Sequence, residues 1–151
     1  MGRTMVAIAA ASFAAMIEAL RLAIADGVPI VSNQICFSLL DRRALTEMCS
    51  LCADKGVKLL AFGVLAGGLL TDRWLGKPPP TEAELSESWS LAKYYRFVPL
   101  FGGWSLLQEL LRALRGVADR HGTTIAAVAT RWVLSQEAVG AECDPSVRKL
   151  R

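Results

Sequence analysis

Two short segments about thirty residues apart place polar and small residues directly after apolar runs. The first run ends in Ser32, Asn33 and Gln34, and the second ends in a glycine-containing stretch at residues 63–68. Hydroxyl and amide side chains can hydrogen-bond a ligand. Because ligands of α/β proteins bind beyond the carboxyl ends of parallel strands, the pattern predicts a ligand site at this edge.

Cys49 and Cys52 form a second candidate, with the C-x-x-C spacing of redox and metal sites. There is no second such pair and the only histidine is His121, so no metal site is expected. The pair is either a redox dithiol or, as we favour, two small apolar residues on the inward side of a helix. Four cysteines in 151 residues are too few for a disulfide framework, which favours a reducing, cytoplasmic location.

The composition is that of one ordinary domain. A hydrophobic content of 53% supports a packed core, and the net charge of +3 comes from scattered basic residues, so we expect no nucleic-acid partner. The apolar residues 5–17 are interrupted by Glu18 and Arg21 before they reach the length of a membrane span. We interpret them as a short strand at residues 6–9 and the start of a helix. The alternative is a cleaved targeting segment, which would make this a small secreted protein.

Hydrophobic periodicity and capping residues predict strands that alternate with helices. Residues 66–90 lose this periodicity and are expected to form a long loop, and residues 89–101 are expected to pack back on the body. The pattern ends after Val139. The expected elements are strands at residues 28–34 and 57–64, and helices at residues 13–25 (capped by Ser12), 41–55 or 46–55, 104–120 and 125–136. This order predicts a parallel sheet with right-handed crossovers.

Three segments carry a resemblance to a known family: VPIVSNQICFSLLDRR at residues 28–43, GVKLLAFGVLAGGLLT at 56–71 and VATRWVL at 128–134. From about residue 6 to residue 139 the sequence resembles the carboxyl-terminal half of an aldo-keto reductase. The resemblance implies an α/β fold, a (β/α)8 TIM barrel, of which about three parallel strands with flanking helices are present and the barrel is not closed. It also implies NADP as cofactor and the NAD(P)H-dependent reduction of aldehydes and ketones.

The same resemblance implies roles for individual residues. Gln34 matches the side chain that hydrogen-bonds the nicotinamide carboxamide, with satisfaction of backbone groups as the alternative. Phe62 matches the aromatic ring that stacks on the nicotinamide, with a buried core ring as the alternative. Backbone groups of Gly63, Leu65 and Gly67 match the turn that approaches the pyrophosphate. Arg73 matches a basic residue that pairs with the phosphates, with a solvated surface arginine as the alternative.

Several departures from the family pattern bear on activity. Ser12 stands where the family has a Ser-Asn pair, and a basic tail replaces the loop that binds the adenosine phosphate. The proton-donor Tyr of the family and its supporting Lys, Asp and His come from the first four strands, whereas this sequence starts at about the fifth. Tyr94 and Tyr95 do not match the donor, so we expect no catalytic residue. We assign residues 1–139 to a partial aldo-keto reductase domain and 140–151 to a divergent, disordered tail.

Three strands cannot close a barrel, and we expect an exposed inner face of Val, Ile and Leu. Such a face is completed by a second copy in a homo-oligomer or by another chain, or else the sequence is a truncated gene model, the interpretation we favour. The first hypothesis is therefore a reductase-like protein that is inactive alone. The second is a non-catalytic interaction module that pairs with a barrel partner.

Overall fold

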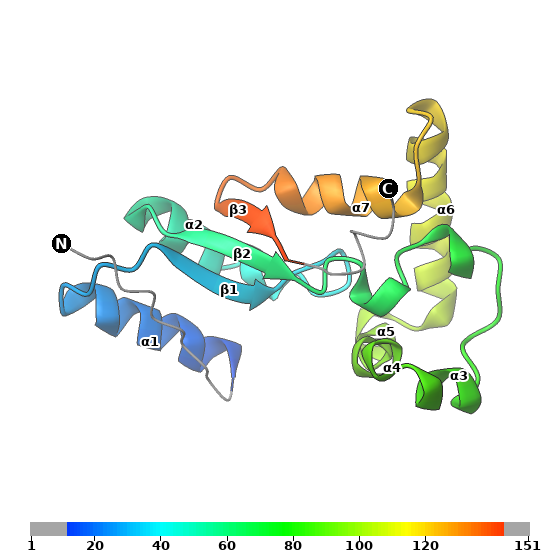
Figure 1. Ribbon diagram of the computed structural model, residues 1–151, viewed down its shortest axis with the longest axis horizontal. Coiled ribbons are helices and arrows are strands. Elements are labelled where there is room, and N and C mark those ends of the chain that lie inside the picture. The colour runs from blue at the N-terminus through cyan, green and yellow to red at the C-terminus, as the bar shows by residue number, and fades with distance from the viewer. Residues whose placement is uncertain (1–11, 144–151) are drawn as a thin grey trace.

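The computed structural model describes residues 12–143 (Figure 1). Three parallel strands form an open sheet in the order β1 (Ser32–Cys36), β2 (Lys58–Phe62) and β3 (Val139–Glu142). The partial, unclosed α/β architecture predicted from the sequence is thereby confirmed. The strand predicted at residues 6–9 lies outside the described residues.

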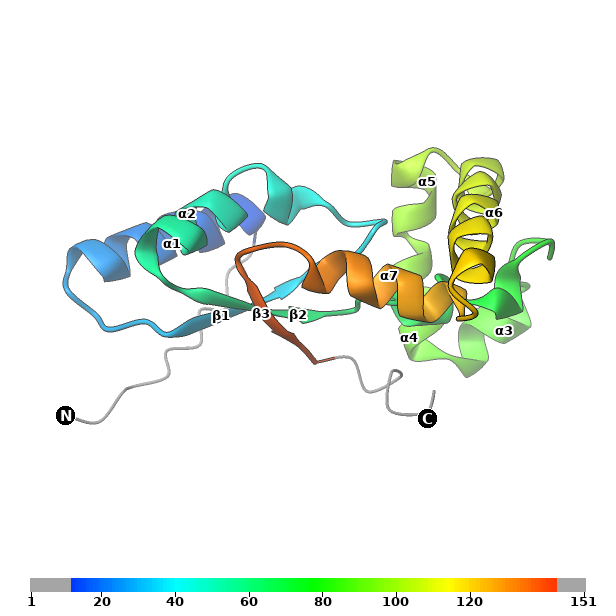
Figure 2. The same ribbon diagram turned by 90° about the horizontal axis from the view of Figure 1, so that it is seen from above.

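Helices cover one face of the sheet. Figure 2 shows α1 (Phe13–Ala25), α2 (Met48–Lys55) and α7 (Ile125–Leu134) on the same side of the strands. Apolar side chains from these helices and from the sheet form one buried cluster. Its members include Ile17, Leu20, Ile35, Met48, Leu59, Ala61 and Val133.

The opposite face of the sheet is covered by no described helix or strand (Figure 2). Side chains alternate along a strand, so Ile35, Leu59 and Ala61 point toward the helices and their neighbours point away. The partners along β1 and β2 on this second face are Ser32 with Lys58, Gln34 with Leu60, and Cys36 with Phe62. We call these six residues the open face. We expected an exposed surface of Val, Ile and Leu, but Leu60 is the one such residue among these six, because Ile35 and Leu59 are on the helix side.

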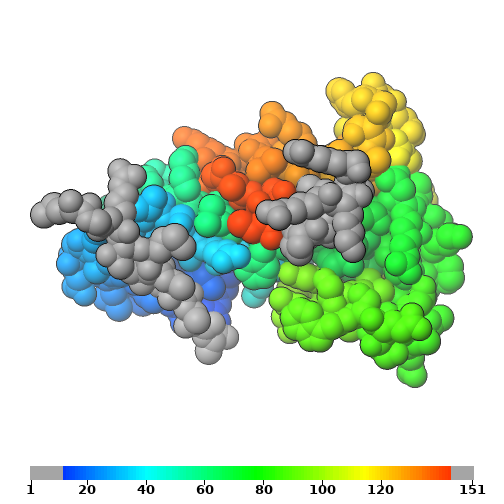
Figure 3. All heavy atoms as spheres, viewed as in Figure 1, coloured from blue at the N-terminus to red at the C-terminus, as the bar shows by residue number. Residues whose placement is uncertain are grey.

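A second group of helices packs beyond the carboxyl ends of β1 and β2. It contains α3 (Glu82–Glu87), α4 (Trp89–Tyr95), α5 (Phe97–Phe101) and α6 (Trp104–Arg120), and it has its own buried cluster. Figures 1 and 3 show an elongated molecule with α1 at one end and this helical group at the other.

The predicted long loop at residues 66–90 is more ordered than expected. It contains the 3-10 turns η2 (Ala66–Gly68) and η3 (Asp72–Trp74), and then α3. A capping box begins α3, in which the Thr81 amide donates to Glu84 Oε2 over 2.9 Å and the Glu84 amide donates to Thr81 Oγ1 over 3.3 Å. This local signal starts a helix inside a stretch that lacks apolar periodicity.

Element boundaries differ from the prediction at three places. β1 begins at Ser32 rather than residue 28, since its pairing partners begin at Lys58. A 3-10 turn, η1 (Arg43–Leu45), precedes α2. We also expected the pattern to end at Val139, whereas β3 continues to Glu142 and the Cys143 amide donates to the Ala61 carbonyl over 2.7 Å. Pairing with β2 therefore orders residues that were assigned to the tail.

Candidate functional site

Gln34 lies in the middle of β1, with an exposed side chain on the open face. The prediction that it ends its strand is wrong, because Ile35 and Cys36 continue the pairing with β2. Its amide therefore projects from the sheet surface rather than beyond the strand. Leu60 is its partner on β2.

Phe62 is the last residue of β2 and is half-buried on the same face. It is the partner of Cys36, two residues along from the Gln34–Leu60 pair, so ring and amide are diagonal neighbours across two strands. A flat apolar ring beside an amide that both donates and accepts can hold a planar ring bearing a carboxamide.

Lys93, on α4, was not predicted as part of this site. Its ammonium lies 5.4 Å from the centroid of the Phe62 ring and 5.1 Å from the centroids of both Trp89 and Tyr94. Each such cation–π contact is worth about 0.5–1 kcal/mol at an exposed site. Trp89 and Lys93 are four residues apart, which places them on one side of a helix, and this spacing was the available sequence signal.

The turn after β2 carries three of the predicted cofactor residues, and α4 packs directly against it. A Cβ atom added at Gly63 would meet the Tyr94 hydroxyl at 2.3 Å, and one added at Gly67 would meet the Ser90 carbonyl oxygen at 2.6 Å. Leu65 is buried in the helical core. The glycines at 63 and 67 therefore make room for α4.

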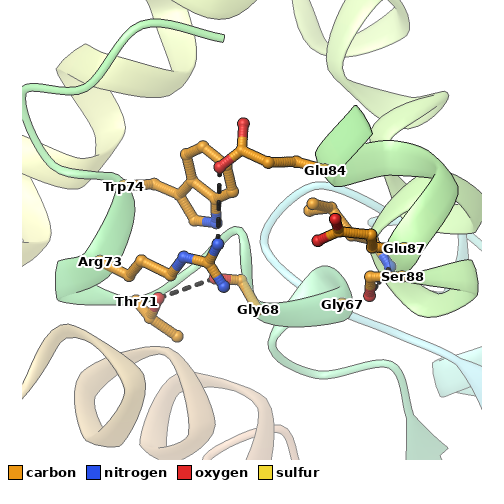
Figure 4. A pocket seen from close by; sticks show the side chains of 9 residues that line it. Gly67, Gly68, Thr71, Arg73, Trp74, Glu84, Glu87 and Ser88 are labelled. Atoms are coloured by element: carbon orange, nitrogen blue, oxygen red, sulfur yellow. Dashed lines mark hydrogen bonds and ion pairs between the residues drawn. The ribbon is translucent and has the colours of Figure 1, made fainter. Parts of the chain in front are cut away.

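Beside this turn lies a cavity of about 410 Å³, bounded by η2, η3, α3 and α4 (Figure 4). Arg73 reaches into it, with one guanidinium nitrogen 3.6 Å from Glu84 and its carbon 5.0 Å from the centroid of the Trp74 ring. The lining residues are Gly67, Gly68, Thr71, Arg73, Trp74, Glu84, Glu87, Ser88 and Leu91.

The charges in this cavity do not favour a phosphate as they stand. Glu84 and Glu87 place two carboxylates beside the single guanidinium of Arg73. Hydrogen bonds from the backbone and side chain of Thr81, helped by Arg73, hold the pKa of Glu84 below its usual range. Glu84 therefore stays ionised and competes with a phosphate for the guanidinium of Arg73.

Cys36, also on the open face, is unsuited to act as a nucleophile. Burial, and then the charge and hydrogen bond of Asp41, raise the pKa of its thiol to about 12, against smaller opposing effects of Arg43 and Lys93. Asp41 is itself buried and holds Arg43 by two hydrogen bonds of 2.7 Å. The hydrogen bonds to Asp41 raise the pKa of the Arg43 guanidinium. The reactive thiolate is thus disfavoured here.

The remaining candidates have structural positions. Cys49 and Cys52 lie on α2 as free thiols with pKa values raised by burial, so the apolar interpretation fits them. Ser12 caps α1 by accepting from the Ala15 amide over 3.1 Å. Within residues 12–143, no group of three or more His, Cys, Asp or Glu side chains is arranged to hold a metal ion. In the same part of the chain, no helix has the length and apolar content to cross a bilayer.

Tyr94 and Tyr95 both pack in the buried cluster of the helical group. Tyr94 is buried against the turn at Gly63, and Tyr95 packs against Trp104 with ring centroids 6.3 Å apart. The structure thus brings together Gln34, Phe62 and the unpredicted Lys93 on one side. Arg73 lies in a separate cavity.

Comparison with known proteins agrees with this architecture. The sequence model of the aldo/keto reductase family matches residues 5–143. Over 119 residues the chain is 40% identical to flagellar radial spoke protein 5 of Chlamydomonas reinhardtii, covering 76% of this chain and 22% of that protein. Over 123 residues it is 30% identical to the chloroplastic pyridoxal reductase of Arabidopsis thaliana, covering 81% of this chain and 30% of that protein. The chain spans less than a third of the length of either relative. The family model matches most of the sequence, and the chain belongs to the aldo/keto reductase family.

Proposed function

We propose that this chain holds the nicotinamide end of an NADP(H) cofactor on its open face and does not reduce carbonyl substrates by itself. The observation that carries the proposal is the placement of the Gln34 amide and the Phe62 ring as diagonal neighbours on a sheet face that no described element covers. Membership of a family of reductases supports the choice of cofactor.

The chemistry of these two residues suits a nicotinamide. The neutral Gln34 amide can donate to and accept from a carboxamide without adding charge, and the Phe62 ring offers a face for stacking. When bound, the cofactor supplies the hydride for carbonyl reduction. The protein must then provide an acid whose pKa is lowered by a neighbouring cation. We assign that role to neither tyrosine of α4, since both pack in the cluster of the helical group.

Tight binding of the phosphates is not part of the proposal. Arg73 is engaged by Glu84, and α4 fills the space beside Gly63 and Gly67. We therefore expect weak affinity, carried by the nicotinamide end.

The test is titration of the purified chain with NADPH, with dihydronicotinamide fluorescence and energy transfer from tryptophan as readouts. Gln34→Leu should weaken binding about tenfold, the loss expected for hydrogen bonds worth about 1.4 kcal/mol. Ser32→Ala, on the same face at the other end of β1, should leave the affinity unchanged. Absence of binding by the folded wild-type chain would refute the proposal, and turnover of a simple aldehyde would refute the lack of independent catalysis.

A second candidate is a non-catalytic interaction module, favoured by the uncovered sheet face and by the similarity to a protein named for the radial spoke. In this function the open face and the outer edges of β1 and β3, which pair with no described strand, pair with a second copy or with a full-length homologue. Size determination of the chain alone and mixed with that homologue tests it. This second candidate fails if the chain is monomeric when alone and forms no complex with the homologue in the mixture.

A further inference from the structure

Lys93 is a charged side chain for which the described part of the chain supplies no carboxylate partner. Among residues 12–143 the ion pairs involve Arg21, Arg43, Arg73 and Arg115, and none involves Lys93. Its ammonium rests instead over the rings of Phe62, Trp89 and Tyr94. Of these rings, Tyr94 is buried and Phe62 is half-buried, so packing fixes the positions of two of the three rings around the ammonium.

The position of Lys93 is set by the docking of α4. Tyr94 packs into the space at Gly63, and the Ser90 carbonyl lies against Gly67. Lys93 lies between these two residues in the helix, and its ammonium is thereby brought to the ring that ends β2. A positive charge is thus built into the platform formed by Gln34 and Phe62.

We propose that Lys93 makes this site distinguish the two oxidation states of the cofactor, favouring the reduced, uncharged nicotinamide over the oxidised, cationic one. The inference rests on the proposed function, since it assumes that the nicotinamide stacks on Phe62. Lys93 acts here as a specificity-determining residue and takes no part in proton or hydride transfer.

The physical reason is that one aromatic ring serves two partners. The negative face of a bare phenyl ring attracts cations, so Phe62 alone would favour the oxidised nicotinamide. The Lys93 ammonium already makes a cation–π contact with the Phe62 ring, and its charge repels an oxidised, cationic nicotinamide stacked on that ring. At an effective dielectric constant of about 20, repulsion between two unit charges at this range makes the affinity for the oxidised cofactor about tenfold or more lower than that for the reduced cofactor.

The consequence is a directional preference. A platform that holds the reduced cofactor and releases the oxidised one suits the reduction of a carbonyl compound rather than the oxidation of an alcohol. The preference is independent of the phosphate cavity, because both forms of the cofactor carry the same phosphates and adenosine.

The experiment compares dissociation constants of NADPH and NADP+ for the full chain, by fluorescence titration and by competition. The ratio of the two constants isolates the nicotinamide ring. Wild type should bind NADPH about tenfold more tightly than NADP+, Lys93→Gln should bring the ratio to one or below, and Lys93→Arg should keep it. Lys55→Gln is the matched control, since Lys55 is an exposed lysine in the last turn of α2, on the helix side of the sheet and outside the open face.

The outcomes separate the inference from the function on which it rests. If both nucleotides bind and Lys93→Gln leaves their ratio unchanged, or if Lys55→Gln shifts it equally, the role of Lys93 is overturned while cofactor binding stands. If neither nucleotide binds a chain that is folded by circular dichroism, the proposed function fails and the inference falls with it.

Discussion

The ring of Tyr94 fills the space that a side chain at Gly63 would need. A Cβ atom there would lie 2.3 Å from the hydroxyl oxygen and 2.6 Å from two ring carbons, at a φ of +67°. Gly63→Ala must therefore strain the turn and displace α4. We expect the free energy of unfolding, measured by urea denaturation, to fall by about 3 kcal/mol.

Gly68→Ala is the control for backbone strain alone. Gly68 also has a positive φ, +92°, but a Cβ atom there would meet nothing within 4 Å. Gly68→Ala should lower the free energy of unfolding by about 1 kcal/mol. Equal losses in the two variants would contradict the conclusion that Tyr94 occupies the space at Gly63.

The ion pair between Arg73 and Glu84 leads to a prediction about the phosphate end of the cofactor. Glu84→Gln removes the competing carboxylate while retaining a side chain that can complete the capping box with Thr81. If Arg73 contacts a cofactor phosphate, NADPH should bind about two- to fivefold more tightly. Fluorescence titration at low and high salt measures the gain, which should shrink as salt rises.

Glu82→Gln serves as the matched charge control on the same helix. Glu82 is exposed and does not line the cavity. It should change the NADPH affinity less than Glu84→Gln does. No gain from Glu84→Gln, or the same gain from both variants, would remove Arg73 from the phosphate site.

The raised pKa of the Cys36 thiol leads us to expect a loss of stability at alkaline pH. Burial and Asp41 raise its pKa from 9.0 to about 12, so above pH 9 the unfolded chain releases this proton while the folded chain retains it. Its contribution to stability is complete below pH 9 and is lost as the pH rises toward 12. A proton that is released only on unfolding lowers the free energy of unfolding by about 1.4 kcal/mol for each pH unit in this range.

Cys36→Ala isolates this contribution from other alkaline effects. In urea denaturation under reducing conditions at pH 8, 9 and 10, the variant should lose stability less steeply than wild type above pH 9. Parallel curves for the two proteins would show that the thiol ionises equally in both states.

Helices were more predictable from the sequence than strands, for a physical reason. The helices at residues 13–25 and 104–120 are confirmed, since an apolar stripe and end signals such as Ser12 are local. β1 was misplaced by four residues because a strand begins where its partner begins, and that partner, Lys58, lies far along the chain. β3 was missed for the same reason: its order comes from β2.

The candidate site divides in the same way. Gln34 and Phe62 share a face because side chains alternate along paired strands. The family resemblance implied a nicotinamide contact for each of them, whereas the register that makes them neighbours comes from the pairing of β1 with β2. The position of Lys93 depends on how α4 docks against two glycines, and the partner of Arg73 depends on where α3 packs. Neither is encoded in residues that lie close together in the sequence.

The buried side chain of Gln108 ties α6 to the segment that follows η3, and its removal should destabilise the fold. Its Nε2 donates to the Trp74 carbonyl over 2.9 Å, and its Oε1 accepts from the Gly76 amide over 2.7 Å. Gln108→Leu leaves both backbone groups without these partners, at an expected cost of about 2–3 kcal/mol in the free energy of unfolding. Gln136→Leu, which removes a bond to the Trp132 carbonyl at a less buried position, should cost under about 1 kcal/mol. If the two losses measured by urea denaturation are similar, the segment after η3 does not depend on Gln108, because water then satisfies both backbone groups.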